Sequence, residues 1–201
     1  MMVAFTADVR RCVDIGQEHR AAWRLIADSY GLQALLAYRL GRWLLCAGRR
    51  YHLWPLLPAC WLMYYLLSRY ARGAYDIRLE LSADIGPGFY IGHFGAIRVS
   101  RCRIGSNCSI GRLTTISAAA DGRGPVIGER VWIGAHAQIV GAHVIGSGAT
   151  IGAGTVVHCD IPERVLCLGN PGRLVIRNYD NRRILGLQAQ GPSQTRDAAA
   201  C

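Results

Sequence analysis

A period of six residues runs through the second half of the chain and restricts its possible folds more than any other feature. Branched apolar residues recur at this spacing in three ladders, and a glycine directly follows eight of the thirteen positions. The ladders are Leu79, Ile85, Ile91 and Ile97, then Ile104, Ile110 and Ile116, and then Ile127, Ile133, Ile139, Ile145, Ile151 and Val157. An amphipathic helix has a period of 3.6 residues, so these ladders are not helical.

One bulky residue and one glycine in every six residues suit a short strand followed by a tight corner. Three such units form a triangular coil of about 18 residues, and stacked coils place isoleucine over isoleucine in the interior. We therefore expect a mainly β fold, a parallel β-helix of slightly more than four coils. The turn-rich stretch 117–125 interrupts the ladders, which predicts a loop that projects from the column.

The part of the chain before residue 75 has a different pattern. Apolar residues at spacings of three and four predict a helix over 30–46. The apolar run 53–67 has two prolines and is shorter than the roughly 20 residues of a membrane span. We expect a helix buried in an oligomer there, and an interfacial membrane anchor stays open because arginines flank the run. The predicted organisation is an N-terminal helical domain (1–74), a β-helix domain (75–177) and a C-terminal tail (178–201).

Composition excludes several classes of chemistry. All 23 basic residues are arginine, so the chain has no lysine for a Schiff base or a P-loop. The arginines give a net charge of +10, but no aromatic-interleaved basic stripe indicates a nucleic-acid partner. The eight cysteines include no CxxC pair and no zinc-like spacing with histidine. We expect free thiols in a cytoplasmic protein without a bound metal, with contact to a membrane surface as an open possibility.

Several segments resemble the serine acetyltransferases, which are hexapeptide-repeat acyltransferases with a left-handed parallel β-helix. Residues 31–50 are similar to the family's helical segment of the GFHALxAYRxxHWL type. The sequence IGPGFYIGHFGAI (85–97) resembles its IGxGxxxxHxxGI segment. Residues 124–141 and 169–175 resemble its later coils and its GxPARxV ending. Within the family, the chain looks most like a short branch linked to polysaccharide pathways.

The resemblance implies transfer of an acetyl group from acetyl-CoA, a co-substrate rather than a bound cofactor, to a hydroxyl acceptor. That acceptor is serine, as in cysteine biosynthesis, or a sugar, as in polysaccharide biosynthesis. The family's catalytic histidine falls on His93, and a neutral imidazole removes a hydroxyl proton near pH 7. The acidic residue that would orient it falls on Arg78, so we assign that role to Glu80, with Asp76 on the same face of the strand as the other candidate.

The family's second active-site histidine falls on Gly124 and is absent. A non-catalytic trimeric scaffold therefore remains an alternative function. If the chain does bind CoA, the resemblance places it on the loop and the late coils, at Arg123, Gly134, Gly152, Ala153 and Arg173. His136 lies in one of the predicted corners, where it could contact CoA or a neighbouring subunit. The resemblance also implies a homotrimer with active sites between the columns.

Overall fold

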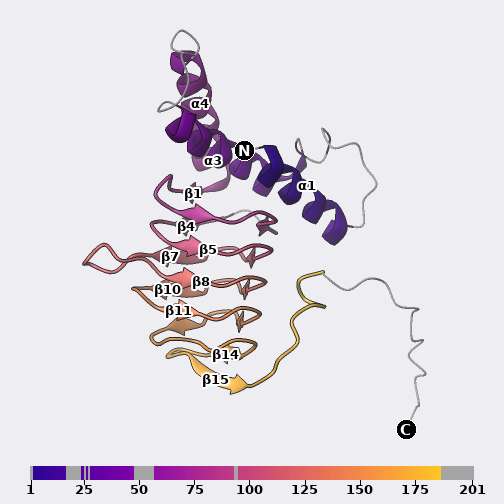
Figure 1. The fold of residues 1–201 in the computed structure, drawn as a ribbon, viewed down its shortest axis with the longest axis vertical. Helices are drawn as coiled ribbons and strands as arrows, with labels where there is room; N and C mark the ends of the chain where they lie inside the picture. The colour runs from indigo at the N-terminus through magenta and orange to yellow at the C-terminus, as the bar shows by residue number, and fades with distance from the viewer. Residues whose placement is uncertain are drawn as a thin grey trace, which may run out of the picture.

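The hexapeptide segment forms a left-handed parallel β-helix, as its periodicity and its family resemblance predict (Figure 1). The computed structural model describes residues 2–16, 24, 26, 28–47, 57–92 and 95–186. The strands are β1 (Ile77–Leu79), β2 (Asp84–Ile85), β3 (Tyr90–Ile91), β4 (Ile97–Val99), β5 (Arg103–Ile104), β6 (Ser109–Ile110), β7 (Thr115–Ser117), β8 (Val126–Ile127), β9 (Trp132–Ile133), β10 (Gln138–Val140), β11 (Val144–Ile145), β12 (Thr150–Ile151), β13 (Val156–Val157), β14 (Leu166–Leu168) and β15 (Arg173–Ile176).

These strands form the three faces of a triangular column. The five-stranded sheet has the order β1-β4-β7-β10-β13, the four-stranded sheet β11-β8-β5-β2, and the six-stranded sheet β15-β14-β12-β9-β6-β3. Neighbouring strands are parallel, except that β15 turns back antiparallel to β14. Each of the first four coils therefore contributes one strand to each face, and each face is a stack of equivalent positions.

Each strand from β1 to β14 points an apolar residue into the column, and these inward residues are at most 5% exposed, whereas all four residues of β15 are exposed. Two of our predictions about the ladders are wrong. The first inward residue is Ile77, which pairs with Ile97, whereas Leu79 pairs with Val99 and is only partly buried. At the other end, Ile161 and Cys167 are buried beneath Ile145 and Ile151 and complete a fifth coil within the described residues. The sequence hides that coil because the spacing from Val157 to Ile161 is four residues.

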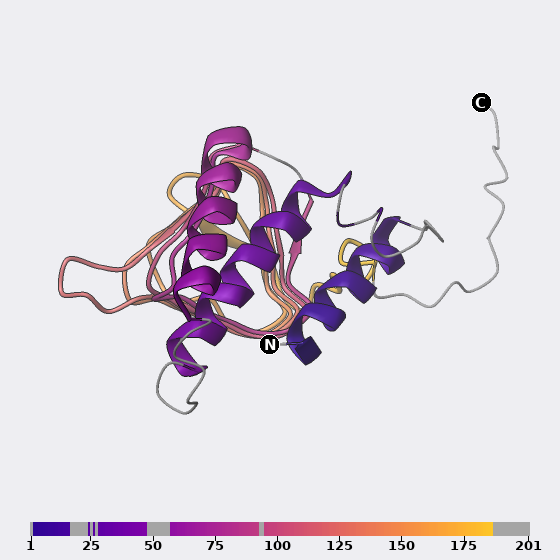
Figure 2. The same cartoon turned by 90° about the horizontal axis from the view of Figure 1, so that it is seen from above.

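Three stacks of corners connect the faces. The first corner joins the five-stranded to the four-stranded sheet, the second joins the four-stranded to the six-stranded sheet, and the third joins the six-stranded to the five-stranded sheet. Among the described residues, the third corner consists of residues 92, 95 and 96, then 111–114, 134–137 and 152–155. The predicted loop 117–125 belongs to the first corner and projects from the column (Figure 2).

Helices cover the end of the column at β1: α1 (Met2–Gly16), α3 (Tyr30–Ala47) and α4 (Leu57–Tyr75). α3 agrees with the helix predicted over 30–46, and α4 covers much of the apolar run. A buried ion pair between Arg39 of α3 and Asp8 of α1 joins these helices to the first coil. The Arg39 guanidinium also donates to the carbonyl oxygens of Ile85 and Gly86, and Asp8 accepts the Phe89 N–H.

The chain after β15 returns to the column. Asn181 Nδ2 donates to the carbonyl oxygens of Arg130 and Ala149 at the second corner, and Leu185 is fully buried. The Arg11 guanidinium bonds Ser109 Oγ and the Leu185 carbonyl, which connects α1, the column and this return segment. The final stretch 187–201 lies outside the described residues.

Candidate active site

The third corner is held together by hydrogen bonds between successive coils. The Gly95 N–H donates to the Tyr75 carbonyl at 3.0 Å, and the Gly95 carbonyl accepts the Leu113 N–H at 2.9 Å. Gly95 has φ of 111°, a left-handed conformation that glycine adopts without strain. Our predicted base, His93, lies outside the described residues, but its neighbours Gly92 and Gly95 are described. Gly92 and Gly95 both lie at the third corner.

The structure separates the two acidic residues that we considered as partners for this histidine. The Asp76 carbonyl accepts the Ile97 N–H at 3.1 Å, so Asp76 lies at the third corner, directly above residues 95 and 96. Glu80 lies at the first corner, beyond the three-residue strand β1, which spans about 10 Å. Its carboxylate accepts the Ser82 hydroxyl at 2.9 Å. Asp76, rather than Glu80, therefore lies at the corner that also holds Gly95.

The signal for this placement was present in the sequence but depended on the register of the first ladder. Residue 96 directly precedes the inward Ile97, and Asp76 directly precedes the inward Ile77. Starting the ladder at Leu79 obscured that equivalence. The Asp76 carboxylate accepts the Arg78 Nε at 3.3 Å, and both side chains are about half exposed. An exposed ion pair of this kind is weak, so Asp76 can exchange Arg78 for another partner.

The structure does bring three of the predicted CoA-binding positions together. Gly134, Gly152 and Ala153 lie at the third corner, below Gly95, and the coils stack there with little space. A Cβ atom added at Gly134 would lie 2.6 Å from the Ala153 nitrogen. A Cβ atom at Gly152 would overlap Leu168 Cδ2. The glycines allow this stacking, and the exposed Ala153 and His136 leave backbone accessible along the corner.

The two predicted arginines lie in different places. Arg173 begins β15 opposite Leu168, whose side chain packs over Gly152, so it is close to the lower end of the third corner. Arg123 lies on the projecting loop at the first corner. Its main-chain N–H and its Nε donate to the Asp121 carboxylate at 2.9 and 2.6 Å, and these bonds lower the pKa of that carboxyl. Within one chain, Arg123 is not brought together with the other predicted CoA-binding residues.

Gly124, at the position of the family's second histidine, packs against the first corner of the coil above. A Cβ atom built there would overlap the carbonyl oxygen of Arg101. The Arg101 guanidinium in turn donates to the Gly122 carbonyl at 3.3 Å. Any side chain at position 124 therefore requires the loop to move, which gives a physical reason why glycine occupies this position.

Two other features bear on the chemistry. Among the described residues, no group of three histidine, cysteine or acidic side chains is arranged to hold a metal ion. A cleft of about 480 Å³ opens between α3, α4 and β1, and its lining includes Arg72, Arg78 and Glu80. Glu80 therefore faces this cleft rather than the third corner.

Comparison with known proteins agrees with this description of the fold. Residues 124–159 match the family model described as bacterial transferase hexapeptide (six repeats). A serine acetyltransferase of Bacillus licheniformis is 34% identical over 116 residues, which cover 56% of this chain and 54% of that protein. The chain thus spans about half the length of this relative.

Two solved structures have the same architecture. Soybean serine acetyltransferase complexed with serine is 31% identical, with a TM-score of 0.69, and the match covers 86% of this chain and 68% of that one. Serine acetyltransferase from Brucella abortus in complex with coenzyme A is 23% identical, with a TM-score of 0.74 and coverage of 89% and 69%. At 23% identity, the match to the Brucella abortus structure shows only that the two chains share a fold.

Proposed function

The chain belongs to the serine acetyltransferase family, and we propose that it transfers the acetyl group of acetyl-CoA to the hydroxyl of L-serine. The observation that carries the proposal is the third corner. One column of corners carries Gly95, which lies two residues from His93 in the sequence, a carboxylate at Asp76 and the stacked backbone at Gly134 and Gly152. The soybean relative that was solved with serine supports serine as the acceptor.

The reaction needs one general base. The hydroxyl oxygen of serine attacks the thioester carbonyl carbon while the His93 imidazole takes the hydroxyl proton. The C–S bond then breaks, the acetyl group remains on the serine oxygen, and the CoA sulfur leaves and regains a proton from the imidazolium. In this proposal Asp76 orients the imidazole and stabilises its charged form, the role of the carboxylate in other histidine-based catalysts. A thiolate is a good leaving group, so a second histidine is not required.

The shape of the third corner suits an extended ligand. The coils from residue 92 to residue 152 are three steps apart, and steps of about 4.8 Å give a length of about 14 Å. We propose that the pantetheine arm of CoA lies along Gly134, Gly152 and Ala153 with its thioester towards His93. Arg173, at the lower end of the corner, would then pair with a CoA phosphate.

A homotrimer of parallel columns completes the proposal. The loop with Arg123 projects from the first corner, away from the third corner of its own chain (Figure 2). In a three-fold assembly, the first corner of one column can face the third corner of the next. The guanidinium of Arg123 would then reach the acetyl-CoA site of its neighbour, and each active site would lie between two subunits.

An acceptor panel tests the proposal. Release of CoA thiol from acetyl-CoA is measured with L-serine and, separately, with a series of free and nucleotide-linked sugars. We expect L-serine to support turnover. Turnover with sugars alone would replace serine by a sugar hydroxyl, and no acceptor-dependent release at all would favour the non-catalytic scaffold.

The assignment of Asp76 has its own matched pair of variants. D76N removes the charge at the third corner, and E80Q removes the equivalent charge at the first corner. We expect kcat to fall at least about tenfold in D76N with KM for acetyl-CoA little changed, because the carboxylate acts on the base and not on binding. E80Q should retain nearly full activity, and the reverse result would restore Glu80 as the partner.

A further inference from the structure

One region of the chain has an extreme charge imbalance. Residues 29–75 contain six arginines and no aspartate or glutamate, so all 13 acidic residues lie outside this stretch. The same region holds three of the five tryptophans and seven of the nine tyrosines. A cationic segment rich in aromatic residues is typical of protein surfaces that contact a membrane interface, where these rings prefer to lie.

The structure shows that much of this apolar surface is uncovered. α4 packs against α3 along one side, and Ala71 is its only buried residue. Six large apolar or aromatic side chains on its other sides are between 39% and 58% exposed: Trp61, Leu62, Met63, Tyr65, Leu66 and Tyr70. We call these six side chains the outer face of α4. A contiguous exposed apolar surface of this kind usually marks an interaction site.

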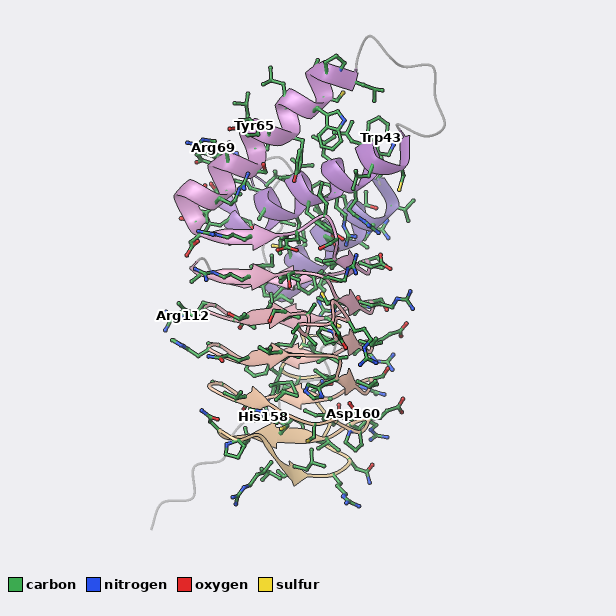
Figure 3. All side chains as sticks on the ribbon, turned by 90° about the vertical axis from the view of Figure 1, so that its left-hand side faces the viewer. Trp43, Tyr65, Arg69, Arg112, His158 and Asp160 are labelled. Carbon is green, nitrogen blue, oxygen red and sulfur yellow. The ribbon has the colours of Figure 1, made fainter. Side chains whose placement is uncertain are left out.

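The outer face also lies where a flat surface can reach it. α4 covers the end of the column opposite β15 (Figure 1), and Tyr65 and Arg69 lie on its outer side, away from the coils (Figure 3). Arg69 follows Tyr65 and Leu66 by one turn in the same helix. Apolar side chains and a cation are therefore presented together at one end of the molecule.

We propose that the outer face of α4 docks on the surface of an anionic lipid membrane. The helix would lie in the plane of the interface, with Leu62 and Leu66 inserted at the boundary between headgroups and acyl chains. Arg69 would pair with a lipid phosphate while its aliphatic stem covers apolar surface. None of the helices in the described part of the chain is long and apolar enough to cross a membrane, so the contact is peripheral.

Charge decides between a membrane and a second copy of the chain. A two-fold symmetric contact would place the same surface of both chains against each other. Because residues 29–75 have no carboxylate, that contact would bring arginines together without a counter-charge. An anionic lipid surface supplies the missing negative charge and also accepts the apolar side chains.

Co-sedimentation of the full chain with vesicles tests the proposal. We expect binding to vesicles of phosphatidylglycerol and phosphatidylcholine, weak binding to phosphatidylcholine alone, and weaker binding as salt increases. The variant L62E/L66E should lose at least about tenfold in affinity, since two apolar side chains can no longer insert. R69Q should lose about fivefold, which corresponds to about 1 kcal/mol for one arginine near the surface.

The matched control is V175E/I176E, because both of these residues are exposed on β15 at the opposite end of the column. This variant should bind vesicles as the unmodified chain does. Circular dichroism checks that each variant is folded, and if L62E/L66E is not, R69Q and the salt dependence still test the proposal.

Two results would overturn the docking of α4 on lipid. The first concerns vesicle binding: either the unmodified chain does not bind anionic vesicles at low salt, or R69Q and L62E/L66E bind them as tightly as the unmodified chain does. The other comes from sedimentation velocity: a smaller assembly in L62E/L66E, with no vesicle binding by the unmodified chain, would show that the outer face is an interface between subunits.

Discussion

Replacement of Arg39 by methionine tests how the helices are attached to the β-helix. The Arg39 and Asp8 side chains are 9% and 0% exposed, and the guanidinium also holds two carbonyl groups of the first coil. Methionine keeps much of the aliphatic volume but leaves the Asp8 carboxylate buried without its counter-charge. Removing one partner of a buried ion pair costs about 3–5 kcal/mol, and we expect R39M to lose that much stability at neutral pH.

The pH dependence of this loss follows from the pKa of Asp8. Burial raises that pKa, while the charge of Arg39 and its hydrogen bond lower it. In R39M both effects of Arg39 are gone and only the main-chain hydrogen bonds of Phe89 and Gly88 still lower the pKa, so the pKa of Asp8 rises further in the folded state. A raised pKa of an acid contributes stability at low pH that is lost as the pH rises through the folded-state value. The difference between R39M and the unmodified chain should therefore be largest near pH 7 and smaller near pH 4.

Urea denaturation followed by circular dichroism, at one fixed protein concentration, measures these differences. The double variant D8N/R39M is the control, because asparagine can still accept the Phe89 N–H but carries no buried charge. It should be more stable than R39M alone. The reasoning is refuted if R39M is as stable as the unmodified chain at pH 7, or if its loss is equal at both pH values.

Three further predictions concern the column and its thiols. G134A should lose about 1–3 kcal/mol and bind CoA less tightly, measured by denaturation and titration calorimetry, because its Cβ has no space beside Ala153. G73A, which has open space around it, should lose nothing. G124H should lower Tm without increasing acetyl transfer, since the new side chain overlaps the Arg101 carbonyl; greater turnover would contradict this. Burial raises the pKa of Cys102 to about 12 and that of Cys108 to about 11. Both thiols should resist alkylation. The free energy of unfolding should fall as the pH rises from 9 towards 11, and it should fall less in C108A. A free energy of unfolding that does not change over this pH range would contradict the prediction.

The periodicity predicted most of the column because one inward residue per strand is a local signal. The six-residue period did not predict the inward positions where the corners differ in length. The four-residue step from Val157 to Ile161 concealed the fifth coil, and the longer connection after β1 led us to place Leu79 where Ile77 lies. Corner length depends on backbone conformation and not on apolar residues, so spacing alone does not fix it.

The candidate site was predictable to a similar extent. Gly134, Gly152 and Ala153 were expected along one groove, and they lie at one corner. Glu80 and Asp76 lie on one face of a strand, so the sequence alone did not separate them. The register of β1 against β4 shows that Asp76 lies at the third corner and Glu80 at the first corner. The separation of Arg123 from the third corner also depends on the path of the coil, which no local pattern encodes.

The most direct test of the account compares two histidine variants in an assay of L-serine-dependent CoA release from acetyl-CoA. H93A removes the proposed base, and H136A removes the exposed histidine that the structure places at the third corner. We predict that H93A lowers kcat at least about 100-fold, the size of a general-base contribution, while H136A retains most of the turnover. Unchanged turnover in H93A would contradict the assignment of the third corner as the catalytic site.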